Sequence, residues 1–358
     1  MSCLFKQLII FTHNPCIFSM FQLFEYQHKF CLESGACLPG FHLGYTTIGT
    51  LNADKSNVVW VFHALTANSN PAEWWDGLVG ENKLFNPAEY FIICVNMPGS
   101  CYGSIHPLDI NPATGEPYYH DFPFFTTRDM IRAYQHLKNH LGIEKVYVGL
   151  GGSMGGQQLL EWAIEEPSLF QHIIPIATNA SLSPWAIAFN ASQRFCIEAD
   201  ITWQNKHAKA GIEGMKVARS FALLSYRNYN TYLLHQGEDT LEKLSNFKSE
   251  SYQRYQGQKL ANRFNAFSYY IISKSMDAHN VGRARGSVEK ALAAITAKTL
   301  VIAVESDLLF PVNEQQYLAE HIRGASLVTI VSTFGHDGFL LEYVQIQHAI
   351  EQFLFSKW

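Results

Sequence analysis

The sequence predicts an α/β fold in which a mainly parallel sheet is flanked by helices. Two observations support this prediction. Short apolar segments rich in β-branched residues alternate with segments of helical spacing in the first half and at the end of the chain, which is the order found when helices connect parallel strands. Between residues 179 and 294 the strand signals disappear and only helical patterns remain. We therefore expect one α/β core that is divided by a helical insertion.

Each predicted strand is a short apolar run, as expected of a strand that is buried on both faces of a sheet. The five clearest are residues 57–62, 90–95, 146–150, 299–304 and 326–331. Between and after them, apolar residues recur with helical spacing at 127–141, 313–322 and 343–353. These strands and helices are the predicted elements of the core.

The domain boundaries follow from the same pattern. We expect residues 20–178 and 295–358 to form the core and residues 179–294 to form a helical lid, in which 211–226 is the clearest helix. Residues 1–19 are expected to be an N-terminal extension that the fold does not use, because a regular pattern begins only after them. Charged and polar residues interrupt the apolar pieces of this extension, so we expect neither a targeting segment nor a membrane anchor.

Composition limits the class of partner. The chain has 358 residues, and 47% of them are hydrophobic, which is enough to bury a large core. The formal net charge is −5, so there is no overall basic field that would favour nucleic acid or an anionic membrane as the main partner.

The seven cysteines are an odd number and are spread along the chain, without a Cys-x-x-Cys pair or the dense pairing of a small secreted scaffold. We expect a reducing, cytoplasmic location.

The most informative local motif is Gly-Gly-Ser-Met-Gly at residues 151–155, which follows a predicted strand and precedes a segment of helical spacing. The pattern G-x-S-x-G at a strand-to-helix turn is typical of a nucleophile elbow, in which glycines avoid clashes and the serine hydroxyl is lifted above the sheet. The N-terminus of the following helix favours negative charge that develops nearby. Ser153 is therefore a candidate nucleophile, although glycine-rich turns also end many strands that have no catalytic role.

A serine nucleophile needs a base, so the elbow predicts an acid and then a histidine later in the chain. Asp307 follows the predicted strand at 299–304, in a position from which a carboxylate can orient an imidazole. Glu305 is the alternative acid, but it comes earlier and is closer to the strand. His336 lies in a glycine-flanked loop just after the last predicted strand. Ser153, Asp307 and His336 are thus the predicted Ser-His-Asp triad.

The oxyanion of an acyl-transfer intermediate needs N–H donors. One donor is expected from Met154, the residue after the nucleophile, and the other from the loop that follows the strand at 57–62. We assign this second donor to Leu65 in the segment His-Ala-Leu-Thr. His63 in the same segment is either a second base or a residue that holds the loop by hydrogen bonds, and we favour the second role.

Beyond the elbow, a series of short motifs runs in order from about residue 22 to the end of the chain. They are GYTTIGTLN (44–52), HALT (63–66), WWDGLVG (74–80), NPATGEPY (111–118), DFP (121–123), TRDM (127–130), GGSMGG (151–156), SPW (183–185), IAFN (187–190), DAH (277–279), SD (306–307) and GHD (335–337). By these motifs the chain resembles the homoserine O-acyltransferases of the α/β-hydrolase superfamily. The resemblance implies an α/β-hydrolase fold with an inserted helical lid.

The resemblance also implies a reaction and its substrates. An acyl group would pass from acyl-CoA to Ser153 and then to the hydroxyl of L-homoserine, in a ping-pong reaction that belongs to methionine biosynthesis. Arg219 would bind the homoserine carboxylate, and Tyr226 lies on the same face of a lid helix. Asp337 would contact the substrate, and the substrate's ammonium group is the suitable partner for this carboxylate. Without the resemblance, Arg219 would more readily be interpreted as a residue of a solvated helix. Family members are commonly homodimers joined through the lid, and residues 264–270 are either such a surface or lid core.

The acyl donor is less determined than the chemistry. Related enzymes use succinyl-CoA, some accept serine, and in succinyl-using relatives an arginine tends to follow the triad acid. Here Asp307 is followed by Leu308, Leu309 and Phe310, so we expect acetyl-CoA as co-substrate. A succinyltransferase and a serine esterase on the same fold are the alternatives. No permanently bound cofactor and no metal are expected, because the sequence has neither a His-Glu-x-x-His pattern nor a P-loop.

Overall fold

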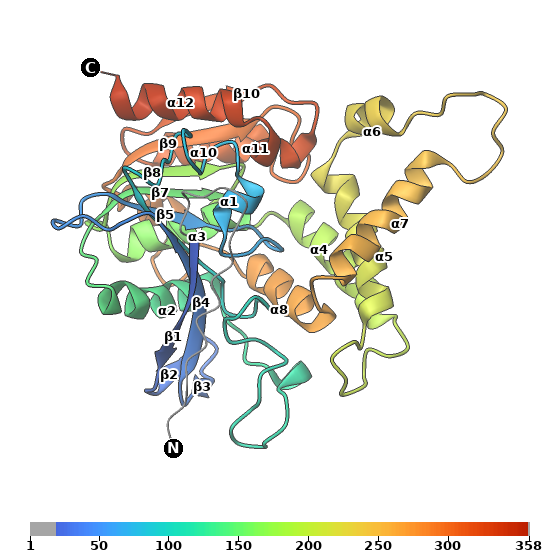
Figure 1. Ribbon diagram of the computed structural model, residues 1–358, viewed down its shortest axis with the longest axis horizontal. Coiled ribbons are helices and arrows are strands. Elements are labelled where there is room, and N and C mark those ends of the chain that lie inside the picture. Colours follow the sequence, from blue (N-terminus) through green and yellow to red (C-terminus); the bar gives the residue numbers. More distant parts are fainter. Residues whose placement is uncertain (1–18, 357–358) are drawn as a thin grey trace.

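The computed structural model describes residues 19–356, which are built around one eight-stranded sheet (Figure 1). The strands lie in the order β1-β4-β6-β5-β7-β8-β9-β10. Their bounds are β1 Ser19–Tyr26, β4 Phe41–Ile48, β5 Val58–Phe62, β6 Phe91–Val95, β7 Val146–Gly152, β8 Phe170–Ile176, β9 Lys298–Val304 and β10 Ser326–Ile330. β4 runs antiparallel to both of its neighbours, and from β6 to β10 all adjacent strands are parallel. The predicted mainly parallel sheet is confirmed.

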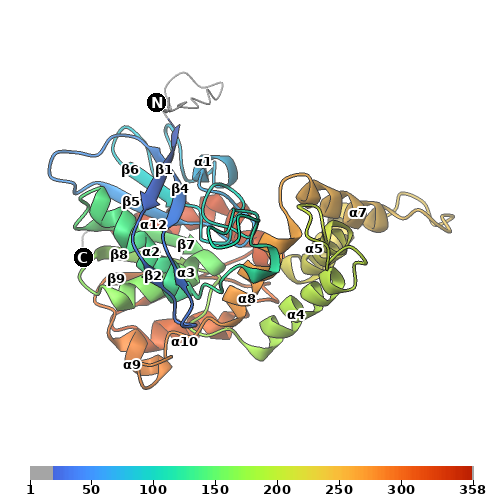
Figure 2. The same ribbon diagram turned by 90° about the horizontal axis from the view of Figure 1, so that it is seen from below.

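Helices cover both faces of this sheet (Figures 1 and 2). One face packs against α2 (Thr127–His140), α3 (Met154–Glu165) and α10 (Val312–His321), and the other against α1 (Pro71–Trp74) and α12 (Tyr343–Phe355). Successive residues of a strand point to opposite faces, so each buried strand contributes to both cores. Trp60 of β5, for example, packs edge-on against Trp162 of α3 with ring centroids 4.8 Å apart, and both side chains are fully buried.

Between β8 and β9 the chain forms six helices, which fall within the residues that we propose as the lid, 179–294. They are α4 Pro184–Glu198, α5 Ile212–Tyr226, α6 Tyr229–Gln236, α7 Lys248–Ala261, α8 Ala266–Asp277 and α9 Val288–Ala293. Figures 1 and 2 show α4, α5 and α7 to one side of the sheet, with α8 closer to it. Ser275 Oγ of α8 donates a hydrogen bond to the Phe125 carbonyl of the core at 2.6 Å.

Partly buried ion pairs attach the segment after α8 to the core. Arg128 of α2 lies 2.9 Å from Glu33 and 2.6 Å from Glu161, while Arg283 reaches Glu33 at 2.8 Å and Arg285 reaches Glu161 at 2.6 Å. Burial alone would raise the pKa of Glu33 and Glu161, but the arginines outweigh it and hold both pKa values below the ordinary range. Each of these carboxylates has two arginine partners, so removing one arginine would weaken the network but would leave neither carboxylate unpaired.

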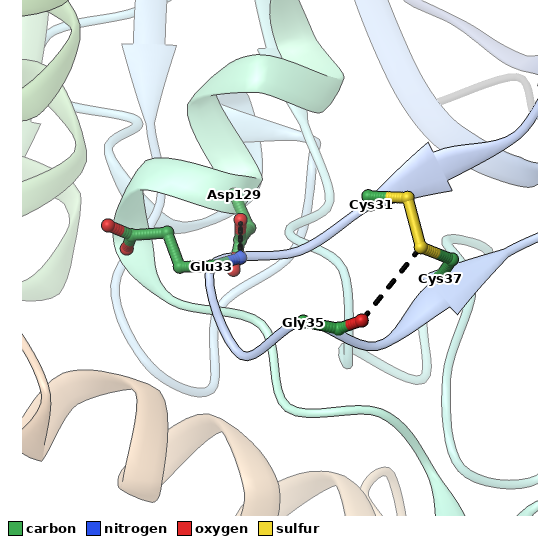
Figure 3. Close-up of a disulfide and its surroundings, with 5 residues drawn as sticks. All are labelled: Cys31, Glu33, Gly35, Cys37 and Asp129. Carbon is green, nitrogen blue, oxygen red and sulfur yellow. Dashed lines mark hydrogen bonds between the residues drawn. A yellow bond between two sulfur atoms is a disulfide. The ribbon is translucent and has the colours of Figure 1, made fainter.

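One disulfide was not predicted from the cysteine pattern. Cys31 of β2 (Phe30–Cys31) and Cys37 of β3 (Cys37–Leu38) are six residues apart in sequence and are disulfide-bonded across a two-stranded hairpin (Figure 3). The loop that it closes contains Glu33, whose backbone N–H donates to Asp129 Oδ1 at 2.9 Å. Spacing alone did not show this pair, because a hairpin brings two cysteines together only once its strands are paired.

Other differences from the prediction lie at the edge and in the centre of the sheet. The expected extension, residues 1–19, lies outside the described residues except for Ser19, which begins β1. β8 was not among the predicted strands, and it contains Pro175, a residue that usually argues against a central strand.

Within residues 19–356, no helix is both long enough and apolar enough to cross a membrane.

Candidate active site

The predicted catalytic and oxyanion residues lie at the carboxyl ends of four parallel strands. Ser153 follows β7, Asp307 follows β9, His336 follows β10, and Leu65 lies in the loop after β5. In an open α/β sheet this edge is where ligands bind, because the loops of neighbouring strands meet there. Residues from four distant parts of the sequence therefore share one site.

Ser153 stands in a strained turn between β7 and α3. Its φ and ψ are 56° and −126°, an uncommon backbone conformation for a residue with a side chain. The turn is held by its N–H, which donates to the Ile176 carbonyl at 3.0 Å, and by its carbonyl, which accepts from Thr178 Oγ1 at 2.7 Å. A Cβ on Gly155 would lie 2.1 Å from the Phe62 carbonyl oxygen, so only glycine fits there. These contacts are those expected of a nucleophile elbow.

His336 and Asp307 are paired at the same edge. Nδ1 of His336 lies 2.6 Å from Oδ2 of Asp307, and both side chains are buried. A carboxylate can only accept, so Nδ1 carries the proton and, in the neutral imidazole, Nε2 is left as an acceptor. Burial alone would lower the pKa of His336, but the Asp307 carboxylate outweighs it and raises the pKa above its ordinary value. Glu305, the alternative acid, is exposed at the end of β9.

His63 lies beneath the loop that follows β5. Its Nδ1 lies 2.9 Å from the Ala64 carbonyl, and its Nε2 accepts the Met97 N–H at 3.1 Å. Burial lowers the pKa of His63 to about 4, so the ring is neutral and both nitrogens are engaged. Gln158 Nε2 also donates to the His63 carbonyl at 3.3 Å. These bonds support the role that we favoured for His63, which is to hold the loop.

The two proposed oxyanion donors are free to act. Met154 is the first residue of α3, where a backbone N–H has no partner within its own helix. Among residues 19–356, neither its N–H nor that of Leu65 donates to another backbone carbonyl. Leu65 lines the same cavity as Ser153. Two backbone donors are thus available beside the candidate nucleophile, as an acyl-transfer site requires.

The site opens into a cavity of about 490 Å³ between the core and the proposed lid. Ser153 and His336 line it from the core, and Arg219 and Tyr226 of α5 line it from the lid. The Arg219 guanidinium lies 5.3 Å from the centre of the Tyr226 ring, which lies 5.8 Å from the His336 ring. The structure therefore brings the predicted lid residues to the predicted triad.

Asp337 also lines the cavity, and its partner was not recognised in the sequence. Arg227 Nε lies 3.2 Å from Asp337 Oδ2. Helix α5 ends at Tyr226 and the backbone of Arg227 is extended, with φ −108° and ψ 179°, so the helical spacing that related Arg219 to Tyr226 does not apply to Arg227. No sequence signal relates Arg227 to Asp337, because their contact depends on how the lid folds onto the core.

Comparison with known proteins identifies the family to which the chain belongs. The family model for the alpha/beta hydrolase fold matches residues 57–343. A homoserine O-acetyltransferase from Cyclobacterium marinum is 50% identical over 332 residues, which cover 93% of this chain and 94% of the relative. A second, from Chlorobaculum parvum, is 41% identical over 92% of this chain and 93% of the relative. The sequence similarity thus spans both the core and the proposed lid.

Solved structures agree on the fold. The crystal structure of homoserine O-acetyltransferase from Bacillus anthracis has a TM-score of 0.87 and 24% identity, covering 95% of this chain and 98% of that one. A mutant of esterase E22 has a TM-score of 0.86 and 26% identity, covering 94% and 100%. The architecture is therefore shared by transferases and esterases, whereas the more similar sequences are named as transferases. The chain belongs to the homoserine O-acetyltransferase family, acyltransferases that are built on the α/β-hydrolase fold.

Proposed function

We propose that this protein transfers the acetyl group of acetyl-CoA to the hydroxyl of L-homoserine in a ping-pong reaction through an acetyl-Ser153 intermediate. The observation that carries the proposal is one cavity that Ser153 and His336 share with Arg219, Tyr226 and Asp337. A hydrolase needs only Ser153, His336 and the acid Asp307. The charged residues match an acceptor that has both a carboxylate and an ammonium group.

The first half-reaction acetylates the enzyme. His336 Nε2 takes the proton of the Ser153 hydroxyl as the serine oxygen attacks the thioester carbonyl of acetyl-CoA. The N–H groups of Leu65 and Met154 bind the oxyanion. When the carbon–sulfur bond breaks, the leaving thiolate takes the proton from His336 and CoA departs as the thiol. Asp307 keeps the imidazole in the required tautomer and stabilises its cation.

The second half-reaction acetylates homoserine. Arg219 binds the substrate carboxylate and Asp337, held by Arg227, binds its ammonium group. His336 takes the proton of the homoserine hydroxyl, whose oxygen attacks the acetyl-serine carbonyl. Ser153 leaves and recovers its proton from His336, and O-acetyl-L-homoserine is released. Each proton that the imidazole takes is returned, so the enzyme is unchanged after a cycle.

The surroundings of the histidine support acetyl rather than succinyl as the acyl group. Phe310 packs against His336 with ring centroids 5.2 Å apart, and Leu309 beside it is buried. The segment that follows Asp307 therefore offers no cation to the extra carboxylate that a succinyl group would bring. Acetyl has no such requirement.

We also propose a homodimer joined through the lid and a cytoplasmic role in methionine biosynthesis. Helix α6 leaves Tyr229, Leu233 and Leu234 exposed, and neighbouring apolar side chains of this kind often mark an interface. Residues 264–270 are not such a surface, because Phe264 and Tyr269 among them are buried in lid core. The equilibrium mass of the purified protein tests the dimer.

Release of CoA thiol by the purified protein tests the proposed reaction. Acetyl-CoA and succinyl-CoA are each supplied with L-homoserine, with L-serine, and with water as the sole acceptor. We expect rapid release only from acetyl-CoA with homoserine. The esterase among the structural neighbours makes hydrolysis the second candidate, and equal release without any amino acid would favour it over transfer.

A further inference from the structure

Two cations line the cavity from the lid and have no part in the reaction at Ser153. They are Lys259 in the last turn of α7 and Arg263 just after it. The helical turn continues past the end of α7, since the Arg263 N–H donates to the Leu260 carbonyl at 3.0 Å. Residues four apart on a helical turn share a face, and like charges at this spacing repel each other. An anion between them would relieve that repulsion.

Neither cation is neutralised by a carboxylate within residues 19–356. Lys259 is exposed and its ammonium group makes no hydrogen bond or ion pair with another described residue. Arg263 Nη1 donates to two uncharged oxygens, the Thr66 carbonyl at 2.5 Å and the Tyr102 hydroxyl at 2.6 Å. Its remaining N–H groups are left largely free to meet a ligand.

Within residues 19–356, neither of the carboxylates that line the same cavity forms an ion pair with Lys259 or Arg263. Glu73 accepts hydrogen bonds from the side-chain amides of Asn68 at 2.9 Å and Asn70 at 3.0 Å. Asp337 is paired with Arg227. Lys259 and Arg263 are thus cations of this cavity that have no described carboxylate partner and, unlike Arg219, no role in binding the acceptor.

Arg263 lies close to the loop that is proposed to bind the thioester oxyanion of the acyl donor. Thr66, which Arg263 contacts, directly follows Leu65, the proposed donor to the thioester oxyanion. A cavity of about 490 Å³ is the size that holds one drug-sized ligand. It suits the acetyl group and part of the thioester arm, so the nucleotide of CoA, with its diphosphate and ribose phosphate, would remain at the lid side of the opening.

We propose that Lys259 and Arg263 form a phosphate-binding site for the nucleotide end of the acyl-CoA donor, an inference that rests on the proposed function. Lysine supplies a mobile point charge, and arginine supplies planar N–H groups that match phosphate oxygens. On a chain with a formal net charge of −5, such a local pair is needed to attract a polyanion. Arg263 also links this site to the oxyanion loop through Thr66.

The test compares Lys259→Gln with Arg254→Gln, a control on the same helix whose side chain is exposed and pairs with Glu250. CoA is titrated into each protein by calorimetry. Kinetics are measured with acetyl-CoA and with S-acetyl-N-acetylcysteamine, a thioester without phosphate. We expect Lys259→Gln to weaken CoA binding and raise the KM for acetyl-CoA by about fivefold to tenfold, with kcat unchanged. Its kcat/KM for the phosphate-free thioester should equal that of the control.

Further arms identify the phosphate and separate the two proposals. A Lys259→Gln defect that persists with dephospho-CoA assigns the site to the diphosphate, and a defect that disappears assigns it to the ribose phosphate. Unchanged CoA binding in both Lys259→Gln and Arg263→Gln would overturn the inference, as would an equal loss with the phosphate-free thioester. If wild-type protein gave no acetylhomoserine, the proposed function would fail, and the CoA titration would still decide whether this site exists.

Discussion

Replacing Asp307 by asparagine tests how His336 is held, because it removes a charge and keeps the shape. In the native protein, Oδ1 of Asp307 accepts the N–H groups of Leu309 at 2.8 Å and Phe310 at 2.9 Å. These two donors would fix the amide oxygen of an asparagine in that place. Its NH2 group would then face His336 Nδ1, which lies 2.6 Å from Oδ2 in the native protein. Because an NH2 group donates, Nδ1 must accept, and the proton moves to Nε2, which can then no longer deprotonate Ser153.

We expect kcat to fall by about 10⁴-fold in Asp307→Asn, the cost of the wrong tautomer in Ser-His-Asp enzymes. This corresponds to roughly 5 kcal/mol of transition-state stabilisation. Folding should be affected much less, because both backbone hydrogen bonds are kept. Glu305→Gln is the matched control, since Glu305 is an exposed acid two residues away, and its activity should stay near that of the native protein.

Initial rates of CoA release, together with a thermal melt of each variant, are the appropriate assay. A folded Asp307→Asn protein that keeps more than about a tenth of native kcat would refute the tautomer argument. A large loss in Glu305→Gln would instead identify Glu305 as the acid.

Three further predictions address the acceptor site, the elbow and pH. Arg219→Gln should raise the homoserine KM by about 30-fold or more, the loss of a charge-assisted contact, and leave acetylation of the enzyme by acetyl-CoA unchanged; an unchanged KM would end its assignment to the carboxylate. Gly155→Ala should lower kcat by about 100-fold, because the new Cβ would lie 2.1 Å from the Phe62 carbonyl oxygen and displace the elbow. Gly237→Ala is the control and should remain active, because Gly237 does not line the cavity and its new Cβ would lie 3.1 Å from the nearest atom. The kcat/KM for acetyl-CoA should fall as pH is lowered through the pKa of His336, which lies above 6.5, because the base must be neutral; a rate independent of pH from 5 to 8, about the range over which histidines titrate, would contradict that role.

The parallel core could be predicted from the sequence because its strands carry their own signal. The segments at 146–150 and 299–304 are buried apolar runs, and the structure has strands at Val146–Gly152 and Lys298–Val304. The positions of Ser153 and Asp307 follow from these strands, since Ser153 comes directly after one and Asp307 three residues after the end of the other.

Pairings between particular side chains could not be predicted in this way. Arg227 meets Asp337 only because α5 ends at Tyr226 and the chain turns back onto the core. The Cys31–Cys37 disulfide depends on a hairpin whose strands are too short to give a periodic pattern. These pairings are properties of the tertiary fold, on which local spacing carries no information.

The acetyl-Ser153 intermediate is the centre of the proposed mechanism and is open to direct measurement. Purified protein is mixed with acetyl-CoA without an acceptor, quenched rapidly in acid, and analysed by peptide mass spectrometry. We expect one acetyl group on the peptide that contains Ser153, its disappearance when L-homoserine is added before the quench, and its absence in Ser153→Ala. Production of O-acetyl-L-homoserine without an acetylated Ser153, or by the Ser153→Ala variant at the native rate, would contradict transfer through this serine.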